Sequence, residues 1–370
     1  MSLKPMKIVI SGGGTGGHIF PAIAIADTLK KRVPGADVLF VGASDRMEMQ
    51  KVPQAGYPII GLWISGFQRN LSLKNLLFPV KVIVALLKAV MVLRKFRPDV
   101  VIGVGGYASG PTLRAAIMLK IPTLIQEQNS FPGVTNRILG RKVNRICVAF
   151  GEMERWFPAD KLVLAGNPLR KSAVDIAGKQ DEAIAFFGLH QEKQTLLIVG
   201  GSQGARAINQ AIEKNIEALA GSGIQLIWQT GESFLAQAQL AVKSVGAADQ
   251  IKPVAFIHRM DLAYAAADLI VSRAGAIAIA EIAVVRKPAI FIPLPTAAED
   301  HQTKNALRLQ EAKAAMVVSN GQADEKLLPE INRLLANPGL LAEMSENMLA
   351  FAMPDAAERI VEEVIKVAGR

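Results

Sequence analysis

Residues 6–18 read MKIVISGGGTGGH. A short apolar run ends there in five glycines, a threonine and His18, and a helix-like PAIAIA follows at residues 21–26. The order is therefore strand, bare loop and helix start. Such a loop exposes backbone N–H groups at the positive end of a helix dipole, where anions bind. The stretch predicts the first βα unit of an α/β domain and a site for negatively charged ligands.

Short apolar runs separated by helical stretches continue outward from this unit in two series. The predicted strands cover residues 38–41, 100–104, 123–125, 145–148 and 162–164, and then residues 196–199, 225–228, 254–257, 269–271 and 289–292. Runs that are apolar on both faces indicate parallel sheets covered by helices. The sequence therefore predicts an α/β protein with two Rossmann-like, doubly wound parallel-sheet domains that face a cleft. A Gly/Pro stop at residues 166–168 places the domains at residues 1–167 and 168–349.

The composition supports this organisation and limits the classes of possible partner. A chain of 370 residues is too long for one ordinary core, so two domains are expected. The single cysteine, Cys147, excludes an internal disulfide and a multi-cysteine metal site, which favours a reducing compartment. A net charge of +10 indicates an anionic partner, which is a nucleic acid, an acidic membrane face or a phosphorylated substrate.

Three glycine-rich loops, each of which follows a predicted strand, are found at residues 12–17, 103–110 and 200–204. Gly12, Gly14 and Gly17 fit the dinucleotide pattern G-x-G-x-x-G, so an NAD-dependent dehydrogenase must be considered. That pattern also needs an acidic residue at the end of the second strand, and Asp45 is displaced into the next segment. The dinucleotide signature is incomplete. No Lys-Ser/Thr pair follows the glycines, which excludes a Walker loop.

Three polar positions admit both a chemical and a structural interpretation. His18 could be a base near neutral pH, or it could cap or pack the loop. Glu281 lies six residues after Gly275, early in a predicted helix, and could accept hydrogen bonds from a ribose or simply face solvent. The polar run at residues 299–305 could bind sugar hydroxyls or cap a loop.

Six segments in a fixed order make a family resemblance specific. They are GGTGGH at residues 13–18, GGYASGP at 105–111, EQN at 127–129, GNPLR at 166–170, GGSQGA at 200–205 and DHQ at 300–302. In these segments the chain resembles the bacterial MurG family. These enzymes transfer N-acetylglucosamine (GlcNAc) from UDP to undecaprenyl-pyrophosphoryl-MurNAc-pentapeptide, known as lipid I. The resemblance implies the GT-B architecture, with a C-terminal helix at about residues 350–370 that packs back on the first domain. Two positions depart from the family pattern: Ala278 replaces a usual threonine and Gln126 a common histidine.

The resemblance also implies roles for particular residues. The catalytic candidates are His18, as the base or the residue that orients the acceptor, and its rival Glu127. The implied donor-binding residues are Thr15, Gly16, Gly17, Asn129, Arg170, Ser202, Ile257, Ala276, Ile277, Ala278, Ile279, Ala280, Glu281 and Gln302. The implied acceptor-binding residues are Gly13, Gly14, Gly105, Gly106 and Tyr107.

The implied reaction is an inverting displacement that makes lipid II for peptidoglycan synthesis, and so serves cell-wall biogenesis, cell shape and cell division. The alternatives are another UDP-sugar enzyme of the same fold, such as a UDP-GlcNAc epimerase, and the dehydrogenase. No Asp-x-Asp motif is present, so we expect no metal at the donor phosphates and no other cofactor. The expected partners are UDP-GlcNAc, lipid I, an anionic membrane surface and other cell-wall synthesis proteins, but no nucleic acid.

An apolar stretch at residues 76–93 is long enough to suggest a membrane span. Lysines spaced by seven would form one stripe on a helix there, at Lys74, Lys81, Lys88 and Lys95. Burying such lysines in a bilayer costs several kcal/mol, so a spanning helix is disfavoured. The helix is either a core helix with a wet lysine edge or a membrane-surface patch, in which Leu76, Leu77 and Phe78 insert and Lys74 and Lys81 meet anionic headgroups. The family resemblance implies peripheral attachment to the cytoplasmic face of the bacterial inner membrane.

Overall fold

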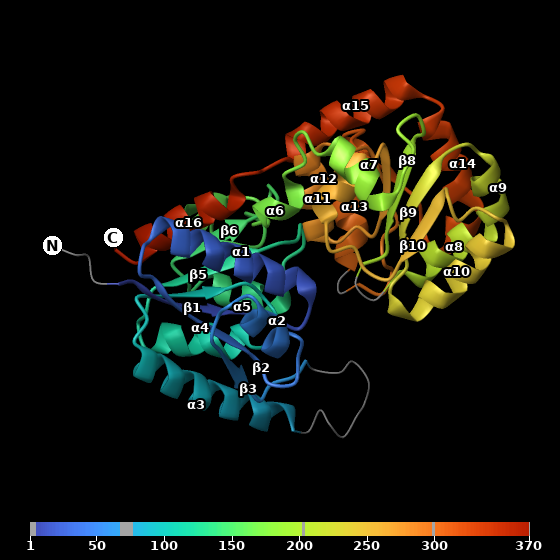
Figure 1. Ribbon diagram of the computed structural model, residues 1–370. Coiled ribbons are helices and arrows are strands. Elements are labelled where there is room, and N and C mark those ends of the chain that lie inside the picture. Colours follow the sequence, from blue (N-terminus) through green and yellow to red (C-terminus); the bar gives the residue numbers. More distant parts are fainter. Residues whose placement is uncertain (1–4, 67–76, 202–203, 298–299, 370) are drawn as a thin grey trace. The chain divides into compact units, whose positions relative to one another are not determined.

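The computed structural model describes residues 5–66, 77–201, 204–297 and 300–369, which form two compact units (Figure 1). Unit 1 contains Met1–Arg170 and Pro354–Arg370, and unit 2 contains Lys171–Met353. The chain therefore passes between the units three residues later than the predicted boundary at 167/168, and its returning segment begins at Pro354.

Unit 1 is built on a seven-stranded sheet in the order β3-β2-β1-β4-β5-β6-β7, and all of its strand pairs are parallel. Its strands are β1 (Lys7–Ser11), β2 (Asp37–Ala43), β3 (Ile59–Leu62), β4 (Val100–Gly103), β5 (Thr123–Glu127), β6 (Arg145–Val148) and β7 (Leu162–Leu164). Its helices are α1 (Gly16–Arg32), α2 (Glu48–Gln54), α3 (Phe78–Phe96), α4 (Ser109–Met118), α5 (Val134–Gly140) and α16 (Ala356–Val367).

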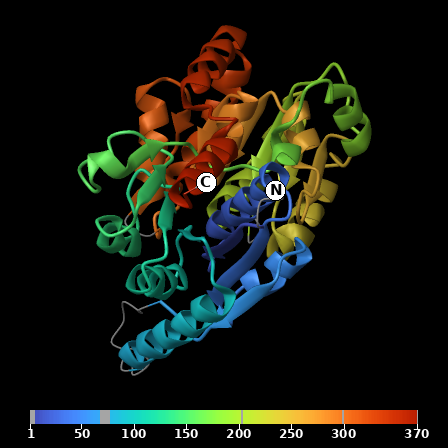
Figure 2. The ribbon, with the colours of Figure 1, turned by 90° about the vertical axis from the view of Figure 1, so that its left-hand side faces the viewer.

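Alternation along β1 explains why both faces of this sheet are covered. Ile8 and Ile10 join a buried cluster with α1 and α16, whereas Val9 joins a second cluster with α3 and α4 on the other face. Successive side chains of a strand point to opposite faces, so a strand that is apolar throughout needs helices on both. The C-terminal helix α16 accordingly packs beside α1 (Figures 1 and 2).

Unit 2 repeats this design with a six-stranded parallel sheet in the order β10-β9-β8-β11-β12-β13. Its strands are β8 (Thr195–Val199), β9 (Gln225–Gln229), β10 (Ile251–Val254), β11 (Leu269–Ser272), β12 (Ala289–Phe291) and β13 (Met316–Val317). Its helices are α6 (Lys171–Val174), α7 (Gln180–Phe187), α8 (Arg206–Lys214), α9 (Ile216–Gly221), α10 (Leu235–Ser244), α11 (Met260–Ala266), α12 (Ala276–Val285), α13 (His301–Glu311), α14 (Ala323–Leu335) and α15 (Pro338–Met348). The two sheets confirm the predicted pair of Rossmann-like domains.

One predicted strand is misplaced, and two strands were not expected. The run at 254–257 was predicted as a strand, but β10 ends at Val254, and residues 255–257 lie in the loop beyond it. The strand includes Pro253, which is tolerated because β10 is at the edge of its sheet. The unexpected strands β3 and β13 are also edge strands and are only four and two residues long.

Helix α3 turns a different face to solvent from the one the lysine spacing suggested. Ala85, Ala89 and Leu93 are buried, and the helix packs against α4 at the outer side of unit 1 (Figures 1 and 2). The most exposed face is apolar and is formed by Val80, Ile83, Val84, Leu87 and Met91, which we call the α3 stripe. Lys81 and Lys88 are half-buried and Lys95 is exposed, so the lysine edge lies beside this apolar face and is not itself the most exposed face.

Lys81 is also engaged within unit 1. Its Nζ donates to the hydroxyl of Ser65 at 3.0 Å and lies 5.4 Å from the centre of the Trp63 ring. Lys74 and Leu76 fall outside the described residues. Throughout the described parts of the chain, no helix is both long enough and apolar enough to cross a membrane.

Candidate active site

The two glycine loops of unit 1 touch each other at the carboxyl end of the sheet. Gly13 and Gly106 meet so closely that a Cβ atom on Gly106 would collide with the Gly13 backbone, and both have positive φ angles. A Cβ on Gly105 would lie 2.7 Å from Cε1 of His18, so the imidazole rests against bare backbone. The predicted acceptor glycines and the predicted base therefore form one constellation.

A buried carboxylate that the sequence did not indicate holds the first loop in place. Glu48, at the start of α2, is 1% exposed. Its Oε2 accepts from the Gly14 N–H at 2.9 Å and its Oε1 from the Ala43 N–H at 2.9 Å. The Gly14 amide therefore already donates to an internal carboxylate, and the role of Gly14 in acceptor binding stays a prediction.

The remaining candidates for anion binding at this loop are therefore the backbone N–H groups at the start of α1. Gly16 and Gly17 stand in the first helical turn, where the helix itself supplies no acceptor for backbone N–H groups. Thr15 and Gly17 are exposed, and Gly14 and Gly16 are half-buried. A ligand can reach the loop along this stretch.

The imidazole of His18 contacts the buried side chain of Gln128, the residue directly after β5. Its Nδ1 lies 3.1 Å from Oε1 of Gln128, whose Nε2 donates to the Val104 carbonyl at 2.8 Å. Gln128 is 2% exposed, whereas His18 is half-buried. Nδ1 of the imidazole is thus anchored, and the residue lies at a partly open surface.

Gln126, which departs from the family pattern, belongs to the same network. Its Oε1 accepts from Nε2 of Gln128, and its Nε2 donates to Oδ1 of Asn167 at 3.2 Å. Asn167 in turn donates from Nδ2 to the Gln128 carbonyl at 3.1 Å. These side chains are all buried, and glutamine supplies the one donor and one acceptor required at position 126.

Glu127, the rival catalytic candidate, is used as a structural acceptor. It is 2% exposed. Its Oε1 accepts from the backbone N–H of Asn129 at 3.0 Å and from Nδ2 of that residue at 3.3 Å. Its Oε2 accepts from the Gly133 N–H at 3.1 Å and from Nδ2 of Asn136 at 2.8 Å. Such a carboxylate organises the loop after β5, and this arrangement favours His18 over Glu127 as the base.

Two predicted side chains of unit 1 lie at its surface. Tyr107 is 46% exposed, and the guanidinium of Arg46 lies 5.8 Å from its ring centre. Arg170 is exposed, with its guanidinium 5.0 Å above the Phe20 ring. Both are accessible to a ligand.

In unit 2, the glycine loop after β8 follows the same principle as the loop of unit 1. A Cβ on Gly204 would collide with the Thr230 carbonyl, and this glycine has a φ of +74°. The loop therefore lies directly against the end of β9. The predicted donor residue Ser202 falls outside the described residues.

Helix α12 carries the predicted ribose ligand. The helix begins after Gly275, and residues 276–280 form its first turns, with Ala276 and Ile279 buried and the other three side chains half-buried. Glu281 is half-buried, and its Oε2 accepts from the Tyr264 hydroxyl at 2.9 Å. Tyr264 is 2% exposed, and burial together with the nearby Glu281 carboxylate raises the pKa of its phenol well above 10. The tyrosine is therefore a permanent hydrogen-bond donor to Glu281.

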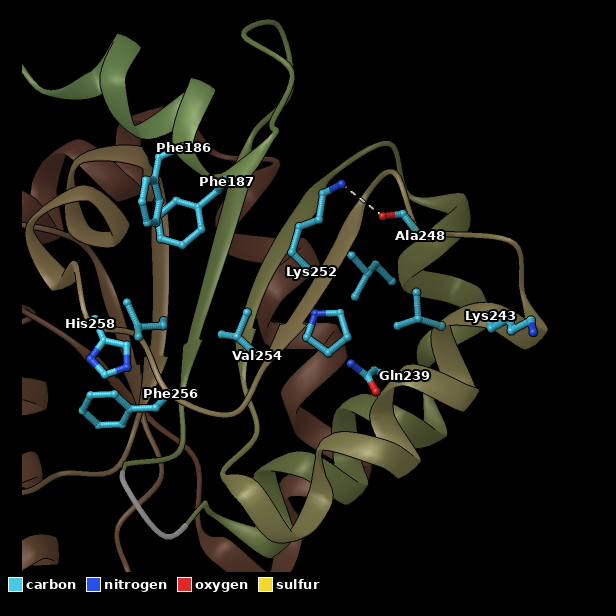
Figure 3. A pocket seen from close by; sticks show the side chains of 13 residues that line it. Phe186, Phe187, Gln239, Lys243, Ala248, Lys252, Val254, Phe256 and His258 are labelled. Atoms are coloured by element: carbon cyan, nitrogen blue, oxygen red, sulfur yellow. Dashed lines mark hydrogen bonds between the residues drawn. The ribbon is translucent and has the colours of Figure 1, made fainter.

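Ile257 can meet a ligand through its backbone but not through its side chain, which is buried. Its N–H already faces Oε1 of the buried Gln229 at 3.3 Å. On the outer side of β10, the same loop borders an apolar groove of about 710 Å³. Figure 3 shows Phe186 and Phe187 on one side of that groove and Gln239 on the other.

Gln302 and Arg273 fix the loops after β11 and β12. Gln302 is half-buried in the first turn of α13, and its Oε1 accepts from the Leu294 N–H at 2.9 Å. Arg273 donates to the Ile292 carbonyl at 3.1 Å and to Oδ1 of Asn320 at 2.7 Å, and burial lowers its pKa. Where the chain is described, no cluster of three or more His, Cys, Asp or Glu side chains is arranged to hold a metal ion.

Comparison with known proteins assigns this arrangement to a family. The models of the glycosyltransferase family 28 N-terminal and C-terminal domains match residues 8–148 and 195–360. A relative from Cytophaga hutchinsonii is 53% identical over 364 residues, which cover 98% of this chain and 97% of that protein. It is named UDP-N-acetylglucosamine--N-acetylmuramyl-(pentapeptide) pyrophosphoryl-undecaprenol N-acetylglucosamine transferase. A crystal structure of Acinetobacter baumannii MurG matches with a TM-score of 0.78 and 31% identity, over 98% of this chain and 100% of that chain. The chain belongs to the MurG family.

Membership of the MurG family confirms the resemblance that the six segments indicated, and makes the protein a glycosyltransferase. The epimerase alternative is supported by fold alone. A UDP-GlcNAc 2-epimerase from Neisseria meningitidis, solved with UDP-GlcNAc bound, has a TM-score of 0.67 but only 16% identity, over 98% of this chain and 100% of that one.

Sequence reasoning missed three buried residues that hold MurG-family positions in place: Glu48, Gln128 and Tyr264. Gln128 stands inside the EQN segment, so its place in a motif was the available signal. Glu48 and Tyr264 stand in no quoted motif, and only the folded chain brings them to the site.

Proposed function

We propose that this protein transfers GlcNAc from UDP-GlcNAc to the MurNAc 4-hydroxyl of lipid I, with inversion at the anomeric carbon, and so makes lipid II for peptidoglycan synthesis. The carrying observation is the full-length identity of 53% to a transferase of that name. In one displacement, the 4-hydroxyl oxygen bonds to C1 of GlcNAc as the bond from C1 to the β-phosphate oxygen breaks. UDP leaves with the electron pair.

His18 is the proposed base. Its half-buried imidazole is held through Nδ1, so Nε2 is the nitrogen that receives the proton of the 4-hydroxyl. The first turn of α1 and the loop with Gly105 and Gly106 surround this imidazole. Their backbone N–H groups are the proposed ligands of the acceptor diphosphate. Tyr107 is proposed to contact the acceptor at the exposed edge of these loops.

Unit 2 supplies most of the proposed donor contacts. Glu281 accepts from the ribose hydroxyls, and the backbone of Ile257 meets uracil. The start of α12 and the glycine loop after β8 face the diphosphate with backbone N–H groups and a helix dipole. Stabilisation of the departing charge by these groups lowers the barrier. Asn129, Arg170 and Gln302 are proposed to contact the donor through charged or amide groups, and no metal is proposed, since the sequence has no Asp-x-Asp motif.

The α3 stripe is the proposed membrane contact. Five exposed apolar side chains with lysines beside them match the chemistry of an anionic leaflet, because the side chains insert and the ammonium groups meet phosphates. An acceptor with an undecaprenyl tail lies in such a leaflet. The proposed location is therefore peripheral, on the cytoplasmic face of the inner membrane.

The decisive experiment measures UDP release and product mass with UDP-GlcNAc and a lipid I analogue. We expect a disaccharide product with inverted configuration, and turnover that depends on the acceptor. UDP-GlcNAc should raise the melting temperature of the protein, whereas NAD should leave it unchanged. Conversion of UDP-GlcNAc without acceptor, or protection by NAD and not by UDP-GlcNAc, would contradict the proposal.

A further inference from the structure

We propose that Gln128 is a positioning residue that fixes His18 in the tautomer with its proton on Nδ1. The catalytic meaning of this tautomer rests on the proposed function, but the tautomer itself follows from hydrogen bonds within unit 1. The argument begins at Val104, whose backbone carbonyl can only accept. The Gln128 atom 2.8 Å from that carbonyl oxygen must therefore be the amide nitrogen.

The other end of the same amide then faces the imidazole as an oxygen. Oε1 of Gln128 lies 3.1 Å from Nδ1 of His18. An amide oxygen has no proton to give, so Nδ1 must carry the proton that is shared. In a neutral imidazole Nε2 is then unprotonated. The tautomer thus leaves the lone pair on the nitrogen that a general base needs.

A second carbonyl confirms the direction of every amide in the network. Nδ2 of Asn167 donates to the Gln128 backbone carbonyl at 3.1 Å, which leaves Oδ1 of Asn167 to accept from Gln126. The remaining Gln126 oxygen accepts from Nε2 of Gln128. Reversing any one amide would place two nitrogens or two oxygens against each other. Because backbone carbonyls fix both ends, the chain of amides has a single orientation.

Burial makes this orientation persistent. Gln126, Gln128 and Asn167 are 0%, 2% and 4% exposed, so a reversed amide could not be compensated by water. Their amides are neutral, so the network keeps its direction at any pH at which the fold survives. Gly105 adds a steric limit, because its bare Cα lets the imidazole lie where a side chain would displace it.

The network also explains the glutamine at position 126. The position needs one acceptor toward Gln128 and one donor toward Asn167. A neutral histidine offers the same pair, so the two residue types are interchangeable there. We therefore expect Gln126→His to preserve the tautomer of His18.

The test is ¹⁵N NMR of the full-length protein labelled at histidine. The chain has four histidines, so His18→Ala assigns the resonance of interest. We expect the neutral His18 of the wild type to show a protonated Nδ1 and an unprotonated Nε2. Gln128→Leu should lose this pattern and give a mixture of tautomers. A wild-type signal from the Nε2–H tautomer would overturn the inference.

Kinetics provide the second readout, with a matched control for loss of a buried amide. Gln225 in unit 2 is equally buried and donates to carbonyl oxygens of His190 and Lys193, so Gln225→Leu carries a similar folding penalty. We expect Gln128→Leu to lower kcat about tenfold to a thousandfold with KM for UDP-GlcNAc within twofold, a loss that does not exceed the ~10²–10⁴ that a general base contributes. Gln225→Leu should keep both kcat and the His18 tautomer. An unchanged kcat in folded Gln128→Leu would contradict the positioning role.

Failure of the inference is distinguishable from failure of the proposed function. If His18 has the Nδ1–H tautomer but His18→Ala keeps its rate, the base is misassigned and the network stands. If the wild type transfers GlcNAc while His18 shows the Nε2–H tautomer, the function stands and the role of Gln128 is wrong.

Discussion

The two units share the order of six strands, and at the carboxyl ends of these strands they surround their predicted functional side chains differently. In unit 1 this edge contains buried polar side chains bonded to loops, among them Glu48, Glu127 and Gln128. In unit 2 the corresponding helix α12 reads AIAIAEIAVV, so Glu281 is its single polar side chain. Burying a polar group is costly unless it is hydrogen-bonded, so each of these residues in unit 1 is held in one orientation by its partners.

We infer from this difference that unit 1 orients a reacting side chain, whereas α12 of unit 2 provides affinity for the donor. A network of fixed amides and carboxylates determines which way an imidazole points, and that matters for a proton transfer. A helix that begins with small residues leaves room for a nucleotide and exposes its backbone N–H groups. Its single carboxylate adds one charged ligand, and together these features serve nucleotide binding. Substitutions of His18 and of the groups that orient it should therefore lower kcat, and substitutions of Glu281 and of the group that orients it should weaken donor binding.

The strongest test of this division is His18→Ala. We expect kcat to fall about 10²- to 10⁴-fold, because a general base is lost, while the Kd for UDP stays within twofold. Turnover with a lipid I analogue and calorimetry with UDP measure the two quantities. His190→Ala, at an exposed histidine of unit 2, is the control and should keep both. A kcat of His18→Ala within threefold of wild type would remove His18 as the base.

The reciprocal test is Glu281→Ala. Loss of a charged hydrogen-bond acceptor for the ribose should weaken UDP binding about 10- to 100-fold, from the ~1.5–3 kcal/mol of such bonds. At saturating UDP-GlcNAc, kcat should stay within threefold. Binding of 2′-deoxy-UDP should suffer less than binding of UDP. Equal losses for both nucleotides would mean that Glu281 acts on some other part of the donor.

Substitutions in the α3 stripe test whether unit 1 also contacts the membrane surface. In Leu87→Glu/Met91→Glu, two side chains that are 59% and 63% exposed become charged. We expect binding to vesicles with anionic lipids to fall about thirtyfold, since each of the two inserted apolar side chains contributes ~1 kcal/mol. The control is Leu240→Glu at a leucine of unit 2 that is 69% exposed, and it should bind vesicles like wild type. Flotation with vesicles provides the measurement, and equal binding by both variants would refute this surface.

The smallest expected effect is that of Tyr264→Phe. The variant loses one hydroxyl that orients Glu281, so UDP binding should weaken about 2- to 10-fold, as expected for a hydrogen bond of ~0.5–1.5 kcal/mol. In a Glu281→Ala background the same substitution should have no further effect on UDP binding. Additive losses in the double variant would show that Tyr264 acts independently of Glu281.

The sequence was informative wherever a pattern is local. Buried strands such as β1 are continuous apolar runs, and the glycine loops mark the turns that follow them. Edge strands gave weaker signals: β13 is two residues long, and Pro253 concealed β10 and shifted the prediction to the next apolar run. In α3 almost every position is apolar, so periodicity could not show which face packs and which is exposed.

The site was predictable to the extent that its residues lie in glycine loops and motif segments. The residues that orient them come from elsewhere in the chain. Glu48 is 34 positions from Gly14, Gln128 is 110 from His18, and Tyr264 is 17 from Glu281. Such pairs depend on strand order and on which helix covers which loop, and neither is encoded in residue spacing. A single sequence without its fold therefore indicates the reacting groups better than it indicates the groups that hold them.

Glu48 affects which anionic metabolites the first glycine loop can bind. Cells hold abundant dinucleotides, and Gly12, Gly14 and Gly17 have the spacing that commonly captures their pyrophosphates. Here one carboxylate already occupies the Gly14 amide, and it would repel a second anion at that point. We therefore expect Glu48 to disfavour a dinucleotide pyrophosphate at this loop, and Glu48→Gln to remove that repulsion.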